Sequence, residues 1–302
     1  MCHRGVSATI GVMGLVSGLV AGPCLAQSTA RNPGTVQVAP NAVPAGVTEV
    51  HGQLGASINN PGLQQVFELS WRRPLTVSRS RWLSEAHIAI GGLTAFTPTQ
   101  ARAGAWVEIA PVSIVVFRAG VEPGYYFGTF NSLTSFDSRT DAFDPDSLRA
   151  RGGAVSGTAS RVYLTPTLRF RAGRFVGAMS ANFEWWSSSA PGPFFYEPTR
   201  DTLLDVNGDR LTDITSAVLY EHPLESGGHL SAGVLHVLTR VNSQTLNQIQ
   251  RFGVVSNRQF TGRVLKLAMP SVTVSVARYL DDPSKHGEWT AAGAIGFSVR
   301  RR

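Results

Sequence analysis

Oxygen-bearing side chains recur at short intervals in one stretch of the chain, and their spacing could bind a metal ion. The stretch contains Asp205, Asn207, Asp209 and Asp213, at relative positions 1, 3, 5 and 9. Such side chains can converge on Ca²⁺, as in EF-hand-like and dockerin-like loops. Two residues depart from that pattern, because Arg210 replaces the glycine of the sharp turn and Ser216 replaces a bidentate Glu. The stretch therefore predicts either a calcium site or an Asn-Gly turn in a polar loop.

Charged and polar side chains also recur at every second position of residues 161–171. One parity holds Arg161, Tyr163, Thr165, Thr167, Arg169 and Arg171, and the other holds Val162, Leu164, Pro166, Leu168 and Phe170. Successive side chains of a strand point to opposite faces, so this stretch predicts one cationic and one apolar face. Ala172-Gly173 then makes a tight turn into a second alternating run, 174–186. Two strands of about ten residues joined by a minimal turn are typical of a membrane β-barrel.

Twelve strand-like runs extend this pattern along the chain. They are residues 47–58, 64–76, 82–96, 102–110, 113–128, 159–171, 174–187, 212–222, 228–241, 257–269, 271–280 and 288–299. The connections after the even-numbered runs are short, whereas 129–158, 188–211 and 242–256 are long. Short periplasmic turns that alternate with longer external loops produce this arrangement. We therefore expect an all-β, antiparallel, up-and-down transmembrane barrel of about twelve strands, with both termini on the periplasmic side.

Aromatic residues gather at the ends of these runs. Those expected at the external interface are Phe96, Tyr125, Phe127, Trp185, Trp186, Tyr279 and Trp289, and those expected at the periplasmic interface are Trp71, Trp82 and Tyr220. Amphipathic rings favour the headgroup level of a bilayer. The pattern therefore predicts two aromatic girdles.

The first residues of the chain predict its export. Residues 1–26 combine Arg4, an apolar core and Cys24-Leu25-Ala26 before Gln27, which is the pattern of a secretory signal peptide. Residues 27–46 are expected to be a periplasmic lead-in, and 47–302 the barrel. The only two cysteines, Cys2 and Cys24, lie in the predicted leader. The mature chain is therefore expected to contain no disulfide bond.

The chain's composition argues against a nucleic-acid partner. Its formal net charge is +7. The arginines are nevertheless spread singly along alternating strands, and the sequence has no nucleic-acid-binding motif. We therefore expect outer-membrane lipid and small solutes as partners, with the oligomeric state left open.

Residues 47–302 together resemble the bacterial outer-membrane β-barrel proteins. The resemblance rests on the alternating runs, the phase of short and long connections and the aromatic positions, and it identifies no specific family. It implies a location in the cell outer membrane. One departure is the end of the chain, because these barrels usually finish on an aromatic residue, whereas Phe297 lies several residues before Arg302.

The parity of the runs also predicts which charged side chains face the lumen. They are Arg72, Glu108, Arg118, Glu122, Arg161, Arg169, Arg171 and Glu184. A charge on the lipid face would cost about 2–4 kcal/mol near the bilayer midplane, which favours the inward assignment. Two interpretations remain open. The side chains form a cross-strand ion network that fills a narrow barrel, or they line a water-filled pore that favours anions.

The outer-membrane phospholipase family supplies one enzymatic alternative. Its nucleophile lies two residues after its histidine on one strand, and His229 and Ser231 have that spacing. This pair begins a strand on the periplasmic side, whereas the family's site lies toward the outer leaflet. We therefore expect no enzyme.

We expect a porin-like passive channel for small solutes, with a preference for anions. The first alternative is a non-conducting structural or ligand-binding barrel that acts through loops 129–158 and 188–211. A lipid hydrolase is third. No cofactor is expected other than Ca²⁺ at Asp205, Asn207, Asp209 and Asp213.

Overall fold

The protein forms a closed antiparallel barrel. The computed structural model describes residues 46–59, 62–78, 80–225, 227–241, 248–261, 263–264, 267–268 and 270–301. The predicted signal peptide and all of the predicted lead-in except Gly46 lie outside these residues. The barrel closes because β1 pairs with both β2 and β17.

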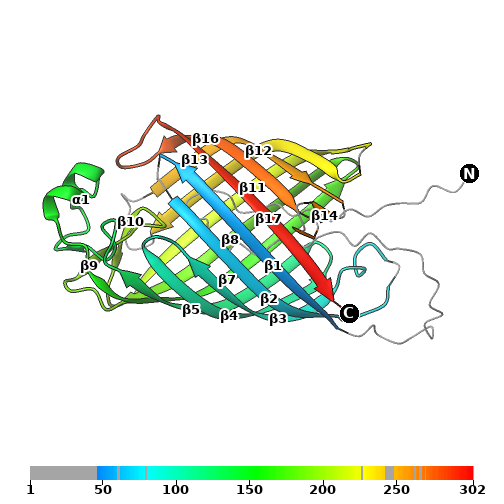
Figure 1. The fold of residues 1–302 in the computed structure, drawn as a ribbon, viewed down its shortest axis with the longest axis horizontal. Helices are drawn as coiled ribbons and strands as arrows, with labels where there is room; N and C mark the ends of the chain where they lie inside the picture. Colours follow the sequence, from blue (N-terminus) through cyan, green and yellow to red (C-terminus); the bar gives the residue numbers. More distant parts are fainter. Residues whose placement is uncertain are drawn as a thin grey trace, which may run out of the picture.

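The wall consists of twelve strands, as the sequence predicts (Figure 1). In order around the barrel they are β1 (Val47–Ile58), β17 (Trp289–Arg301), β16 (Ser271–Asp281), β13 (Gln248–Gln259), β12 (His229–Val241), β11 (Asp209–Pro223), β8 (Phe175–Ser188), β7 (Ser156–Ala172), β5 (Val115–Phe127), β4 (Gln100–Val112), β3 (His87–Phe96) and β2 (Gly62–Pro74). Every neighbouring pair is antiparallel. The fold class predicted from the alternation is therefore confirmed.

Smaller elements lie outside the wall. A three-stranded sheet contains β6 (Ser135–Phe136), β9 (Phe194–Glu197) and β10 (Thr202–Asp205), and a short hairpin contains β14 (Arg263–Val264) and β15 (Leu267–Ala268). The helix α1 (Pro145–Arg151) begins after Asp144, whose carboxylate accepts the N–H groups of Asp146 and Ser147, and ends at the left-handed Gly152. Figure 1 shows α1, β9 and β10 at the barrel end opposite to the end of β17. We call the folded segment 129–155 together with 189–208 the external cap.

Two predicted runs differ from the observed strands by more than four residues at one end or both. The tenth run, predicted at 257–269, is in fact β13 at Gln248–Gln259. Its lipid-facing side contains Gln248 and Gln250, so the apolar alternation that marks the other strands is weak there. The third run was predicted to begin at residue 82, but residues 81–85 form a turn and β3 begins at His87.

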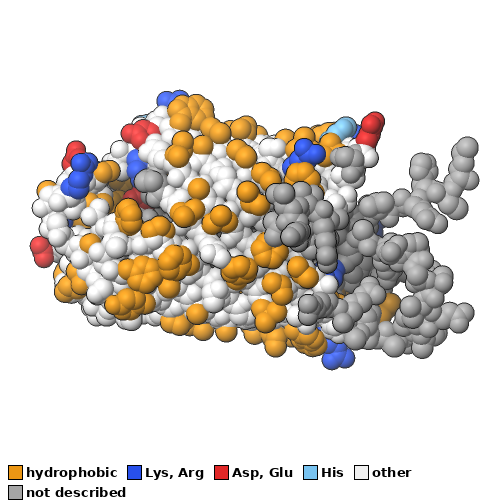
Figure 2. Space-filling view, in the orientation of Figure 1, with side chains coloured by type: hydrophobic (Ala, Val, Ile, Leu, Met, Phe, Trp, Pro, Cys, Tyr) orange, Lys and Arg blue, Asp and Glu red, His pale blue; other side chains and the backbone are white. Residues whose placement is uncertain are grey.

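The outer wall is apolar. Exposed apolar side chains occur on the outward parity of most strands, among them Leu54, Leu69, Ile90, Val107, Val121, Val162, Leu168, Val254 and Ile295. Figure 2 shows hydrophobic side chains spread over the visible face of the barrel. A wall that contacts lipid requires this surface. Among the described residues, no helix is long and apolar enough to cross a bilayer.

The predicted girdles are confirmed in part. Outward aromatic side chains at the cap end include Phe96, Tyr125, Phe127, Trp185 and Trp289, and those toward the other end include Trp71, Phe175 and Tyr220. The prediction was wrong for Trp186 and Tyr279, which are both only 2 % exposed. Each occupies the inward parity of its strand, so it packs in the lumen and not against lipid.

Candidate functional site

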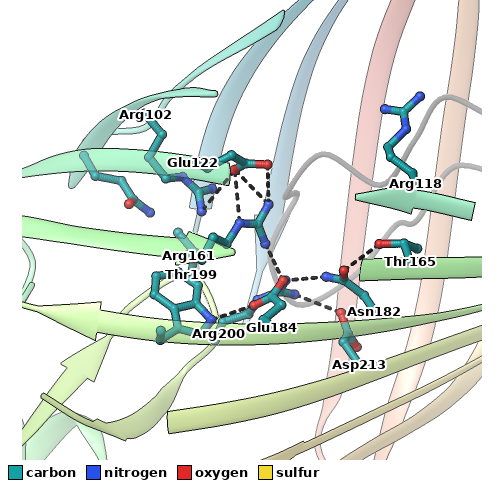
Figure 3. A network of polar contacts seen from close by, with 12 residues as sticks. Arg102, Arg118, Glu122, Arg161, Thr165, Asn182, Glu184, Thr199, Arg200 and Asp213 are labelled. Carbon is teal, nitrogen blue, oxygen red and sulfur yellow. Dashed lines mark hydrogen bonds and ion pairs between the residues drawn. The ribbon is translucent and has the colours of Figure 1, made fainter. Parts of the chain in front are cut away.

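A network of paired charges follows the inner wall beneath the cap, and Arg161 lies at its centre (Figure 3). Arg161 on β7 stands directly opposite Glu122 on β5. Its Nε donates to Glu122 Oε2 at 3.1 Å, its Nη2 to Glu122 Oε1 at 2.9 Å, and its Nη1 to Glu184 on β8. All three side chains are at most 1 % exposed. Such pairs are stable in a dry interior only when each charge keeps its partner.

Glu184 joins the barrel wall to the cap. Its carboxylate accepts hydrogen bonds from Arg161, from Arg200 and from Asn182, and from the indole Nε1 of Trp186 at 2.7 Å. Arg200 belongs to the turn between β9 and β10, and its Nη1 also donates to Asp213 Oδ2 at 2.8 Å. One arginine from the cap therefore links two carboxylates of the wall.

A second group of charges lies on β2 to β5. Arg118 donates from Nε to Glu108 Oε2 at 2.9 Å and from Nη1 to Glu68 Oε2 at 3.1 Å. His87 Nε2 lies 2.9 Å from Glu108 Oε1. The Arg118 guanidinium also stacks on the ring of Trp106, 3.7 Å from its centroid. Glu68, His87, Glu108 and Arg118 therefore also form a buried group of paired side chains on this part of the inner wall.

Further polar contacts fasten the cap to the rim. Glu197 of β9 accepts the Tyr126 hydroxyl of β5 at 2.9 Å and the Gln100 amide of β4 at 3.4 Å. Asp201 accepts the Tyr196 hydroxyl at 2.6 Å and pairs with Lys285 of the β16–β17 connection. These contacts join the cap to three separate parts of the rim.

Two cap groups have shifted pKa values. Burial, together with the neighbouring Asp201 carboxylate, raises the pKa of Tyr196 above 10.0. Burial alone would lower the pKa of Lys285, but the attraction of Asp201 outweighs it, so the pKa lies above 10.5. Both groups therefore keep their protons across the neutral range.

Apolar packing closes the space between cap and wall. One buried cluster joins the wall residues Tyr126, Trp186, Leu211 and Val241 to the cap residues Leu133, Phe195 and Leu204. A second cluster within the cap contains Phe136, Phe143, Leu148, Tyr196 and Leu203. The cap is therefore a folded unit with a core of its own.

The residues predicted to line a pore all lie on the inward parity, in two different environments. Glu108, Arg118, Glu122, Arg161 and Glu184 are buried in the ion network. The side chains of Arg72 and Arg171 are more accessible, 21 % and 37 % exposed, and Arg171 pairs with Glu221. Arg169 is partly exposed, and its Nε has no hydrogen-bond acceptor among the described residues. Their role in conduction stays a prediction.

The four predicted calcium ligands do not come together. Asp205 pairs with Arg139 at 3.1 Å, and its carboxylate accepts the Asn207 N–H at 2.9 Å. Asp209 begins β11 and accepts the Asp205 N–H at 3.1 Å. Asp213 lies farther along β11, where it faces Arg200. No group of three or more His, Cys, Asp or Glu side chains that could hold a metal ion occurs among the residues that the structure describes. The polar turn is therefore the better interpretation of this stretch.

The sequence interpretation missed Arg200 and Glu197, which connect the cap to the network. Both lie in a long loop without periodicity, so no alternation could assign them to the lumen. His229 and Ser231 begin β12 at the end opposite to the cap, as predicted, and Ser231 is 1 % exposed.

No protein-family model matches the chain, and no curated protein matches it either. Several solved structures are similar over most of its length. They include the beta domain of the Bordetella autotransporter Brka (11 % identity, 85 % of this chain and 100 % of that chain, TM-score 0.43) and an outer membrane channel from Pseudomonas putida F1 (12 %, 89 % and 100 %, 0.38). A third is the translocator domain of the autotransporter NalP from Neisseria meningitidis (10 %, 83 % and 87 %, 0.34). The closed wall and its apolar outer face are those of an outer-membrane β-barrel.

Proposed function

We propose that this protein is an outer-membrane barrel closed at its external end, which acts through its cap as a structural or ligand-binding barrel. The observation that carries the proposal is the contact of Arg200, from the cap, with Glu184 of the wall. Both side chains are at most 2 % exposed. This contact supports a cap that stays over the lumen, because its removal would leave Asp213 without its paired cation and Glu184 with Arg161 as its only one among the described residues.

Electrostatics supports a closed resting state. A buried ion pair that loses one partner costs about 3–5 kcal/mol, because a charge is then left in a poorly solvated place. Displacing Arg200 would remove the cation that faces Asp213 in the wall. Moving Glu197 would also leave the Tyr126 hydroxyl without its acceptor. The paired cap is therefore the low-energy arrangement.

A porin-like channel for small anions is the second candidate, and one observation favours it. Arg72, Arg169 and Arg171 face the lumen on the side of the network away from the cap, and they are less buried than the network itself. Rows of arginine in a wet lumen favour anionic solutes. In this candidate, solutes pass when the cap is displaced.

Conductance in a planar bilayer separates the two candidates. Purified wild-type protein is expected to give no single-channel steps, whereas the double variant Arg200→Gln/Asp201→Asn is expected to give steps. Arg149→Gln is the matched control, since that side chain is 74 % exposed on α1. Steps from the wild type with an anion-selective reversal potential in a salt gradient would overturn the closed barrel and establish the channel.

A further inference from the structure

A shallow groove of about 930 Å³ lies on the lipid-facing side of the wall, at the cap end of β3 to β8. Its outward lining includes the small side chains Ala101, Ala103, Pro123, Ser160 and Ser187. These positions alternate with the buried inward residues Arg102, Glu122, Arg161 and Trp186, so they lie on the membrane side. A concavity in a lipid-facing wall loses dispersion contacts unless a chain fills it.

Aromatic side chains place one edge of this groove at the headgroup level. Phe96 and Tyr125 line it and are 55 % and 50 % exposed. Both rings pack on Phe127, with centroid distances of 5.9 and 6.1 Å. Aromatic belts of this kind mark the interface between acyl chains and headgroups. The groove therefore spans from the acyl region to the external headgroup region.

Two outward arginines lie beyond the other edge of the groove, on β11 and β12, the two strands that follow β8 around the wall. Arg210 of β11 stands opposite Trp185 of β8, two residues before the groove residue Ser187. Arg240 follows on β12, opposite Thr212. Both are exposed, while their neighbours Leu211 and Val241 are buried in the lumen. Two guanidinium groups at this level complement a phosphate, which arginine binds with paired N–H donors.

From this juxtaposition we infer that the outer wall binds a phosphate-bearing lipid of the outer leaflet. Its acyl chain occupies the groove over Ala101, Ala103 and Pro123. Its phosphate lies against Arg210 and Arg240. Ser160 and Ser187, whose hydroxyls are 3.0 Å apart, offer hydrogen bonds to the polar part of the lipid between these two regions. The inference depends on the membrane position of the wall and not on whether the lumen conducts.

Native mass spectrometry of the full-length protein in detergent tests this inference, with dioleoyl phosphatidic acid and dioleoyl phosphatidylcholine as probes. The wild type is expected to retain phosphatidic acid in preference to phosphatidylcholine. Arg210→Gln/Arg240→Gln is expected to weaken that preference by about fivefold for each arginine removed. Arg73→Gln is the matched control, because Arg73 is also exposed and outward but lies near the opposite end of β2.

A second variant separates the groove from the arginines. Ala103→Trp is expected to reduce retention of both lipids, since the indole fills the groove. Heat-dependent gel mobility checks that each variant is folded. Equal retention of the two lipids by the wild type, or an unchanged preference in the double arginine variant, would overturn the inference. A dimer mass that Ala103→Trp abolishes would also overturn it, since a second copy would then occupy the groove.

Discussion

Two adjoining parts of the inner wall fill the lumen with different kinds of side chain. On β5, β7 and β8 the filling is a charge network centred on Arg161, with Glu122 and Glu184 as its partners. On the adjoining part of the wall the filling is an apolar patch on β8, β11, β12, β13 and β17, made of Val176, Ala217, Leu219, Leu235, Val237, Val255, Ala292 and Ala294. Apolar filling depends on volume and loses stability gradually, whereas charge filling depends on complete pairing. The external cap contacts both parts, because Arg200 pairs with Glu184 on β8 and with Asp213 on β11, and Asp201 pairs with Lys285.

Removing the shared carboxylate should have the largest effect. Glu184→Gln leaves Arg161 and Arg200 buried without their common counter-charge, so we expect a loss of about 3–5 kcal/mol in the free energy of unfolding. Urea unfolding in lipid vesicles, followed by tryptophan fluorescence, measures it. A loss below about 1 kcal/mol would mean that water reaches the network.

A matched truncation on the apolar side should cost less. Val237→Ala removes two methyl groups from a side chain that is 1 % exposed, so we expect a loss of about 2 kcal/mol from transfer and cavity terms. The same urea titration applies, and the cap should keep its protease resistance. Release of the cap by this variant would show that the two sides are coupled.

Weakening one rim contact should affect the cap alone. Asp201→Asn removes the charge that pairs with Lys285, while asparagine tolerates the left-handed backbone at this position, where φ is 53°. We expect a local loss of about 1–2 kcal/mol and therefore about tenfold faster trypsin cleavage at cap arginines such as Arg139. Global unfolding should change little, and a matching global loss would contradict the separation of cap and wall.

Alkaline pH should weaken the contacts of Asp201 with Tyr196 and Lys285, with a smaller effect than the Asp201→Asn substitution. The pKa values of Tyr196 and Lys285 are raised above their ordinary values of 10.0 and 10.5 in the folded protein. Groups shifted in this direction contribute stability that is fully present below the ordinary pKa and is lost as the pH rises through the raised value. Cap cleavage by a protease active at high pH should therefore stay slow up to about pH 10 and increase above it. Faster cleavage already near neutral pH would contradict the contact.

The sequence specified the wall better than the cap, for a physical reason. A strand with one face toward lipid must alternate apolar and polar side chains. The inward direction of Arg161, Glu122 and Glu184 could therefore be predicted, and it is confirmed. The pairing of Arg161 with Glu184 on the next strand could be anticipated for the same reason.

Other features had no periodic signal. Arg200 and Glu197 reach the rim through contacts that span long stretches of chain, such as Gln100 with Glu197, and these depend on tertiary packing. Asp209 was assigned to the preceding loop, because β11 begins at Asp209, three residues earlier than the alternation predicts. Gln248 and Gln250 weaken the apolar alternation at the start of β13, so this strand was predicted to begin too late in the chain.

Thiol labelling from the external side tests most directly whether the cap closes the lumen. The only cysteines, Cys2 and Cys24, lie in the predicted signal peptide, so Thr167→Cys introduces a single thiol at a lumen position that is 2 % exposed. Asp146→Cys on α1, where the side chain is 89 % exposed, serves as the accessible reference. We predict that a charged, membrane-impermeant reagent modifies Asp146→Cys rapidly, and Thr167→Cys only when Arg200→Gln is also present. Rapid external modification of Thr167→Cys with Arg200 intact would contradict the closed barrel.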